Sequence, residues 1–208
     1  MPVLYYAPGA CSLAVHIVLE WIGVPYEAVA ADRRTAEYRA INPAGAVPAL
    51  RCGSGVVLTQ ASAILHYLAR SHPAAELLDE TTPEAAAEND RWSAFLTGDL
   101  HPAFFPVFTP GRYTISTDPA TLDAVRAAGI ALVRTKMTLL DRHLTGRTWM
   151  VGDRRSVLDA YTVPMVSWAA ARLPDGLASL PAVAAHHARM LDDAVVQRVM
   201  AAENAARR

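Results

Sequence analysis

A cysteine at the predicted start of a helix is the first residue that could do chemistry. Cys11 follows an apolar, strand-like run at residues 3–6 and a Pro-Gly turn, and an amphipathic pattern begins at Ser12. The unpaired N–H groups and aligned peptide dipoles of a helix start favour an anion, so a thiol there commonly has a pKa below its free value of about 8.5. A reactive thiolate is one interpretation of Cys11, and a small buried hydrophobe in a tight turn is the other.

A proline opens a strand-like run further along, in the segment Ala-Val-Pro-Ala-Leu at residues 46–50. A cis bond between Val47 and Pro48 would turn the Val47 N–H and C=O groups outward, where an extended peptide could pair with them as one more strand. The alternative is an ordinary trans proline at the start of a strand, and trans bonds are far commoner in folded proteins. The residues alone leave both interpretations open.

The segment Thr-Gln-Ala-Ser-Ala-Ile at residues 59–64 follows a strand and begins a helix. The N–H groups of Ala61 and Ser62 would then face one spot, as binding of a carboxylate requires, and Gln60 offers an amide beside them. Capping of the helix by the hydroxyl oxygen of Thr59 or Ser62 is the alternative. The pattern therefore predicts either an anion-binding corner or a capped helix end.

Composition and charge argue against several classes of partner. The 208 residues are 52% apolar and 19% charged, with a formal net charge of -1. No broad basic field is present to hold a nucleic acid or an anionic membrane surface, and no apolar run reaches the roughly 20 residues of a bilayer span. Because the start of the chain lacks a secretion signal, we expect a cytoplasmic protein in which Cys11 and Cys52 form no disulfide.

Strand-like and helical patterns alternate up to about residue 78. Their order is strand 3–6, helix 12–22, strand 26–31, helix 35–42, strands 47–52 and 56–60, and helix 62–70. The Gly-Ser-Gly sequence between the last two strands is typical of a tight antiparallel hairpin. This order predicts a small mixed sheet with helices packed on it, which is an α/β unit.

Helical patterns dominate after a Pro-containing, acidic segment at residues 71–84, which is typical of a linker. Apolar residues recur at helical spacing within residues 92–100, 132–144 and 161–168. Ser156 and Asp159 form a Ser-x-x-Asp capping signature, for which we expect a structural role. We therefore predict two domains, residues 1–78 and residues 86–208.

Taken in order, these motifs resemble those of the soluble glutathione S-transferases, most closely the bacterial beta class. YYAPGACSLAVHIVL at residues 5–19 is similar to the opening motif of that class, INPAGAVPAL at 41–50 to its proline loop, and LTQASAILHYL at 58–68 to its γ-glutamyl site. GDLHPAF at 98–104 and GDRRSVLDAY at 152–161 fall where the helical domain of the family has its signatures. The resemblance covers essentially the whole chain.

The resemblance implies a thioredoxin-like N-terminal domain followed by an all-α C-terminal helical bundle, assembled as a homodimer. Glutathione, the co-substrate, would lie in a cleft between the domains. Its backbone would follow Val47 beside Pro48, and its γ-glutamyl carboxylate would meet Gln60, Ala61 and Ser62. No metal ion is implied.

The same resemblance implies a set of catalytic residues: Cys11, His101, Tyr6 and Ser12. His101 resembles the histidine that the beta class brings toward the glutathione sulfur, while a packed structural histidine is the alternative. Tyr6 matches a tyrosine of the opening strand that is not the main activator in this class. Asp99 would reach the glutathione amine, and an ordinary exposed helix carboxylate is the other interpretation.

The sequence also departs from the family. Ala61 stands where a serine or asparagine is usual, so one hydrogen bond to the carboxylate, typically worth roughly 1.5 to 3 kcal/mol, is missing. Arg33 and Arg34 are our only candidates for the glycine carboxylate. Pro102 replaces a residue that is often basic, and Pro164 predicts a helix kink.

We therefore expect a glutathione transferase that joins the glutathione thiolate to small electrophilic, hydrophobic substrates, with thiol transfer as a side activity. Only the thiolate attacks an electrophile efficiently, so such a site must stabilise S⁻. Two alternatives remain open. One is a binding or interaction protein without catalysis, and the other is a specialised glutathione-dependent isomerase, dehalogenase or ether-cleaving enzyme.

Overall fold

A four-stranded sheet forms the first part of the chain in the computed structural model, which describes residues 1–206. The strands are β1 (Val3–Tyr6), β2 (Glu27–Ala30), β3 (Ala49–Arg51) and β4 (Val57–Thr59), in the order β2-β1-β3-β4. β2 runs parallel to β1, whereas β3 pairs antiparallel with β1 and with β4. The predicted mixed sheet and its hairpin are thus confirmed, with β2, β3 and β4 shorter than expected.

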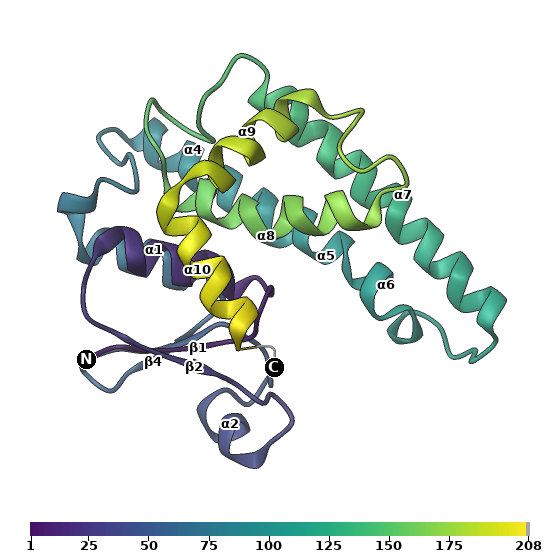
Figure 1. Cartoon of the computed structure of the whole chain (residues 1–208), viewed down its shortest axis with the longest axis horizontal. Coiled ribbons are helices and arrows are strands. Elements are labelled where there is room, and N and C mark those ends of the chain that lie inside the picture. Colours follow the sequence, from purple (N-terminus) through teal and green to yellow (C-terminus); the bar gives the residue numbers. More distant parts are fainter. Residues whose placement is uncertain (207–208) are drawn as a thin grey trace.

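Three helices flank this sheet: α1 (Ser12–Ile22), α2 (Ala36–Ile41) and α3 (Ala61–Ser71). α1 ends at Gly23, whose φ of 76° lies in the left-handed region that glycine adopts without steric cost. α1 and α3 pack against each other above the sheet as drawn in Figure 1, and α2 lies below it. This is the thioredoxin-like arrangement that the family resemblance implies.

Helices dominate the rest of the described chain (Figure 1). They are α4 (Pro83–Ala94), α5 (His101–Ala103), α6 (Phe105–Phe108), α7 (Pro119–Leu144), α8 (Val157–Arg172), α9 (Pro181–Asp192) and α10 (Ala194–Ala205), with single turns at Pro73–Ala75 and Pro110–Arg112. A π-helical turn, Phe95–Leu100, joins α4 to α5, and in it the His101 N–H donates to the Leu96 C=O. Pro102 and Pro106 have no N–H to donate, so the helix is broken into short pieces here.

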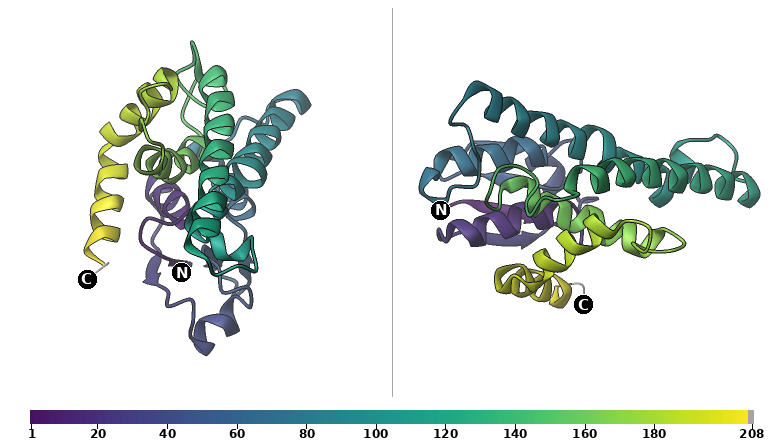
Figure 2. Two further views of the ribbon diagram at one scale, coloured as in Figure 1. Left: turned by 90° about the vertical axis from the view of Figure 1, so that its right-hand side faces the viewer. Right: turned by 90° about the horizontal axis from the view of Figure 1, so that it is seen from above.

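One apolar core joins the sheet part to the helical part. α8 is buried along most of its length, packs on both α1 and α9, and continues as one helix through Pro164. α10 returns along α1, as Figure 2 shows from two sides.

The predicted capping box at the start of α8 is confirmed: the Ser156 N–H donates to Asp159 over 2.7 Å, and His186 of α9 lies 2.7 Å from the same carboxylate.

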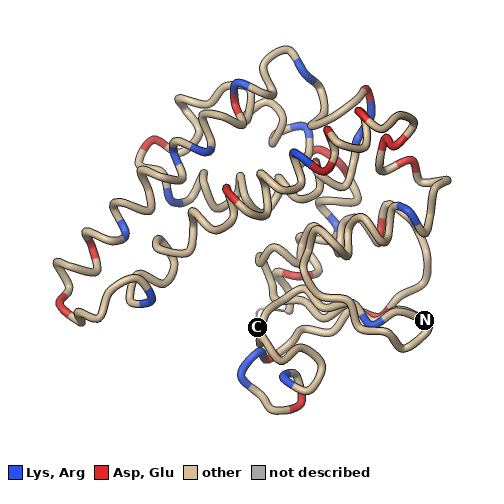
Figure 3. Tube along the Cα trace, turned by 180° about the vertical axis from the view of Figure 1, so that it is seen from behind, with Lys and Arg blue, Asp and Glu red and all other residues tan. Residues whose placement is uncertain are grey.

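Charged side chains of both signs are interspersed along the chain (Figure 3). Many form exposed pairs, such as Arg70 with Glu80 at 2.6 Å and Arg198 with Glu20 at 2.9 Å. Within residues 1–206, the apolar helices are too short, and the long ones too polar, to cross a lipid bilayer.

The buried imidazole of His187 in α9 predicts how stability depends on pH. Burial, and then the neighbouring His186, lower the pKa of His187 from 6.5 to about 4. The unfolded chain therefore binds this proton first as the pH falls, and the folded state loses stability from about pH 6.5 down to its own lower pKa. Between pH 7 and pH 5, we expect the free energy of unfolding in urea to fall by about 2 kcal/mol less in His187→Asn than in the wild type. Equal losses in the two proteins would contradict a buried, uncharged His187.

Candidate active site

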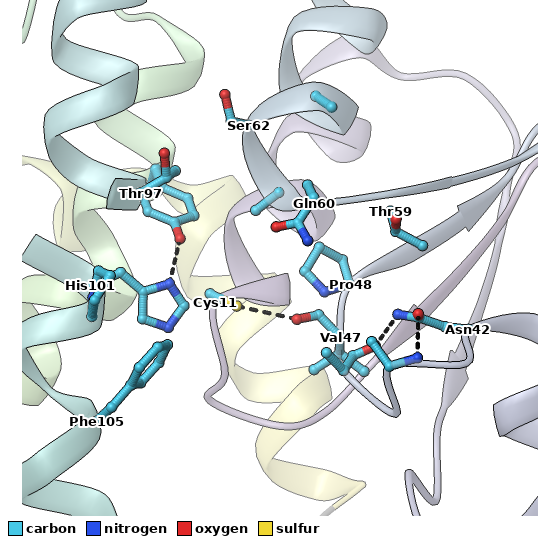
Figure 4. Close-up of a pocket in the computed structure, with 16 residues that line it drawn as sticks. Cys11, Asn42, Val47, Pro48, Thr59, Gln60, Ser62, Thr97, His101 and Phe105 are labelled. Carbon is cyan, nitrogen blue, oxygen red and sulfur yellow. Dashed lines mark hydrogen bonds between the residues drawn. The ribbon is translucent and has the colours of Figure 1, made fainter. Parts of the chain in front are cut away.

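A cavity of about 640 Å³ lies where the sheet part meets the helical part (Figure 4). The sheet part lines it with Cys11, with the loop before β3 and with the start of α3, and the helical part adds side chains from α5, α6 and α8. The predicted residues found in its wall are Cys11, Val47, Pro48, Gln60, Ala61, Ser62 and His101. The volume is in the range of small-molecule sites, so most of the predicted site meets around one ligand-sized space.

Cys11 lies at the end of the loop before α1 and is only 7% exposed. Its thiol donates a hydrogen bond to the Val47 C=O over 3.3 Å, and the bond between Val47 and Pro48 is cis. Burial raises the pKa of Cys11 to about 11 and outweighs the opposing effects of the N–H groups at the start of α1 and of Arg33. The expectation of a lowered pKa is therefore wrong, because the cost of desolvating a thiolate exceeds what the helix start supplies. Cys11 is a free, uncharged thiol.

The loop before α1 is a tight turn held by its own hydrogen bonds. The Ala10 N–H donates to the Ala7 C=O over 3.0 Å, and Gly9 between them has a φ of 70°, which favours glycine in this kind of turn. The Ser12 hydroxyl accepts from the Ala7 N–H over 3.1 Å and donates to the Ala7 C=O over 3.2 Å. In the structure Ser12 therefore fastens the loop from outside the cavity wall.

The helical part holds both polar groups of the Gly9 backbone. Glu203 of α10, which is 2% exposed, accepts a hydrogen bond from the Gly9 N–H over 3.0 Å. Trp168 of α8 donates its indole N–H to the Gly9 C=O over 2.9 Å. The second oxygen of Glu203 lies 3.0 Å from Nδ1 of the buried His16 in α1. Because Gly9 nearly adjoins Cys11, side chains from two distant helices determine where the thiol lies.

The start of α3 faces the cavity with its first two residues, Ala61 and Ser62. The preceding Gln60 has φ 69° and ψ 118°, a sparsely populated conformation that costs about 1–3 kcal/mol and is typical of functional sites. The Gln60 side chain makes no capping bond, and the Ser62 hydroxyl is paired with the Ser93 hydroxyl of α4 over 2.7 Å. Hydroxyl capping is thus not used at this end, and its N–H groups can donate hydrogen bonds to an anion.

His101 and Tyr161 complete the cavity wall on the helical side. Nδ1 of His101 lies 2.7 Å from the Tyr161 hydroxyl, and the imidazole centroid lies 5.1 Å from that of Phe105 and 5.3 Å from that of Trp168. Burial lowers the pKa of His101 to about 4 and raises that of Tyr161, so both side chains are uncharged at neutral pH. His101 is therefore both packed and part of the wall.

Tyr161 is a cavity residue that the sequence reasoning missed. It belongs to an apolar stripe of the predicted helix, and a tyrosine in such a stripe is most simply interpreted as core packing. The one signal that could have found it is its position at the end of the motif at residues 152–161.

Tyr6 and Asp99, like Ser12, are not in the cavity wall. Tyr6 is buried against His16, with ring centroids 5.3 Å apart. Asp99 lies 3.3 Å from Lys136 and borders a separate hollow of about 500 Å³ beside Trp92. Their functional roles stay predictions.

Basic side chains gather beside the cavity but not in its wall. Arg33 and Arg34 line a neighbouring hollow of about 590 Å³ together with Arg39. No three His, Cys, Asp or Glu side chains within the described residues 1–206 come together as a metal site requires.

Comparisons with known proteins agree with this geometry. The family model "Glutathione S-transferase, N-terminal domain" matches residues 9–71. A relative from Xanthomonas campestris, glutathione S-transferase GST-4.5, is 41% identical over 203 residues, which is 96% of this chain and 98% of the relative.

Two solved structures extend the likeness to the fold. A sphingomonad glutathione S-transferase complexed with glutathione has a TM-score of 0.84 and 34% identity, covering 97% of this chain and 98% of that one. A bacterial beta class glutathione S-transferase from Sphingomonas chungbukensis has a TM-score of 0.85 and 33% identity, covering 97% of this chain and 98% of that one.

The buried carboxylate of Glu203 generates a prediction. Glu203→Ala leaves the Gly9 N–H and His16 without their acceptor, so we expect the free energy of unfolding in urea to fall by about 3–5 kcal/mol. The control is Glu80→Ala, which breaks the exposed pair with Arg70 and should cost less than about 1 kcal/mol. Similar losses in the two variants would show that Glu203 does not hold the two parts together.

Proposed function

The chain belongs to the glutathione S-transferase family, and on this premise we propose that its cavity binds glutathione and that the enzyme joins the glutathione sulfur to small electrophilic, apolar substrates. One observation carries the proposal. A single cavity combines an open helix start, the backbone of Val47 and the side chains of Cys11 and His101. The anionic end, the extended backbone and the sulfur of glutathione would each have a binding partner in this cavity.

The ends of glutathione differ in charge and therefore in partner. The γ-glutamyl carboxylate suits the N–H groups of Ala61 and Ser62 at the start of α3, where the helix dipole favours an anion. The extended backbone suits Val47, whose C=O already accepts from Cys11 and whose N–H donates to no acceptor within residues 1–206. The sulfur would then lie beside Cys11 and His101.

The reaction needs a glutathione thiolate, because the neutral thiol is a weak nucleophile. The thiol proton passes to solvent, the sulfur lone pair forms the new C–S bond, and a leaving group on the substrate departs with its bonding electrons. N–H and S–H donors aimed at the sulfur favour its ionised form. The one S–H of Cys11 can serve in this way once the glutathione backbone takes its place on the Val47 C=O and the thiol turns to the ligand. Phe105 and Pro102 give the cavity an apolar side for the second substrate.

A side activity in thiol transfer follows from the same geometry. With the glutathione sulfur beside Cys11, the Cys11 thiolate can attack the glutathione sulfur of a disulfide between glutathione and another small thiol, form a mixed disulfide with glutathione and release the other thiol as its thiolate. A second glutathione thiolate then attacks this mixed disulfide, which releases glutathione disulfide and regenerates the Cys11 thiolate. The high pKa of Cys11 makes this exchange slow at neutral pH.

The domain division, the homodimer and the cytoplasmic location are part of this proposal. We divide the chain into a glutathione-binding domain at residues 1–78 and a helical domain at residues 86–208. Exposed apolar side chains on the hairpin and α3, namely Val56, Val57 and Tyr67, offer a surface to a second copy in a homodimer. The free cysteines suit the reducing cytoplasm, where conjugation would serve detoxification.

The variant Cys11→Ala distinguishes conjugation from thiol transfer. We expect glutathione binding, measured by calorimetry, to persist, conjugation to an aryl halide to fall roughly tenfold through loss of one donor, and thiol transfer to stop. Cys52→Ala, which removes the other buried cysteine, should leave all three unchanged. A wild type that neither binds glutathione nor turns over substrate would instead favour the binding-protein alternative.

Ala61→Ser restores the side chain that is usual in the family. We expect the Kd for glutathione to fall about tenfold, because a hydroxyl at the start of α3 can donate to the carboxylate. Ala74→Ser, outside the cavity, should bind as the wild type does. No change in the Kd of Ala61→Ser would place the carboxylate elsewhere.

A further inference from the structure

The Tyr161 hydroxyl is a buried polar group without a role in the chemistry described so far. The side chain is 1% exposed, and within residues 1–206 the only hydrogen-bond partner of its oxygen is Nδ1 of His101, 2.7 Å away. We infer that Tyr161 donates its proton to Nδ1 and thereby holds His101 as the tautomer with hydrogen on Nε2, so that the ring presents an N–H donor to the bound sulfur. This inference rests on the proposed function.

The direction of the bond follows from elimination. A tyrosine O–H needs an acceptor when it is buried, and Nδ1 is the acceptor within reach. If Nδ1 carried the hydrogen and donated to the tyrosine oxygen, the hydroxyl hydrogen would be buried without a partner. A neutral imidazole carries one hydrogen, so accepting at Nδ1 places it on Nε2.

The orientation of the ring is fixed from two sides. Phe105 and Trp168 lie against the imidazole, and Trp168 is itself held by its hydrogen bond to Gly9. Nε2 makes no hydrogen bond to the described residues, and His101 belongs to the cavity wall. The free N–H is therefore available to a ligand in the cavity.

This tautomer assigns the task of His101. Nε2 has no lone pair to take a proton from glutathione, so the ring does not act as a base through that atom. It stabilises the thiolate as a neutral donor, which also agrees with its low pKa. Tyr161 is a positioning residue, because it acts on the sulfur only through His101.

The tautomer can be measured in the ligand-free protein by NMR of ¹⁵N-labelled histidine, with the His101 signals assigned from their loss in His101→Asn. We expect hydrogen on Nε2 in the wild type and a mixture of tautomers in Tyr161→Phe. The matched control is Tyr26→Phe, which also removes a tyrosine hydroxyl in a 2.7 Å bond, here to Glu20, and should leave the His101 signals unchanged. Hydrogen on Nδ1 in the wild type, or an unchanged tautomer in Tyr161→Phe, overturns the inference.

The effect on the sulfur is measured with glutathione bound, by ultraviolet titration of its thiolate and by steady-state kinetics. In Tyr161→Phe we expect a higher pKa for the bound thiol and a roughly tenfold lower kcat, with the KM for glutathione nearly unchanged. An unchanged thiol pKa and kcat in a variant with an altered tautomer would overturn the role of the N–H donor. If the wild type fails to bind glutathione, the proposed function fails, while the NMR result stands by itself.

Discussion

The two hydrogen bonds on the Gly9 backbone are the interaction on which the site depends. Cys11 belongs to the sheet part, but five of the 16 residues in the cavity wall come from the helical part, so the cavity keeps its shape only if the two parts are fixed in relation to each other. Glu203 and Trp168 provide that relation at the turn that leads into α1. The buried contact between Glu203 and His16 extends it to the middle of α1. A small loop thus takes its position from side chains 194 and 159 residues further along the chain.

Desolvation and the helix start act on the Cys11 thiol in opposite directions, and desolvation is the larger effect. This outcome suits the proposed function, in which the site would hold a second sulfur beside Cys11. Two neighbouring thiolates would repel each other, and each would raise the pKa of the other. A neutral Cys11 avoids that repulsion and leaves a single negative charge for the site to stabilise. The uncharged His101 fits the same proposal, since its N–H would act on that charge as a dipole, and Tyr161 would act only through His101.

Local patterns were enough to predict the hairpin, the starts of α1 and α3 and the capping box at Ser156, because each depends on residues close together in the sequence. The residues alone do not predict the cis bond between Val47 and Pro48, because trans bonds before proline are far commoner in folded proteins. The pKa of Cys11 was predicted in the wrong direction because burial is a tertiary property. The sequence does not predict the roles of Glu203 and Tyr161, because their hydrogen-bond partners lie on other elements. The helical periodicity of apolar residues carries no information about such contacts.

The shared apolar core has a further consequence, for the way the molecule denatures. Because α8 packs on α1 of the sheet part and on α9 of the helical part, neither part can expose its interior without exposing that of the other. Loss of structure should then be cooperative across both parts, in a single transition without a folded half-molecule. A protease would accordingly find no long-lived intermediate to cut, and the chain would survive intact or be degraded as a whole.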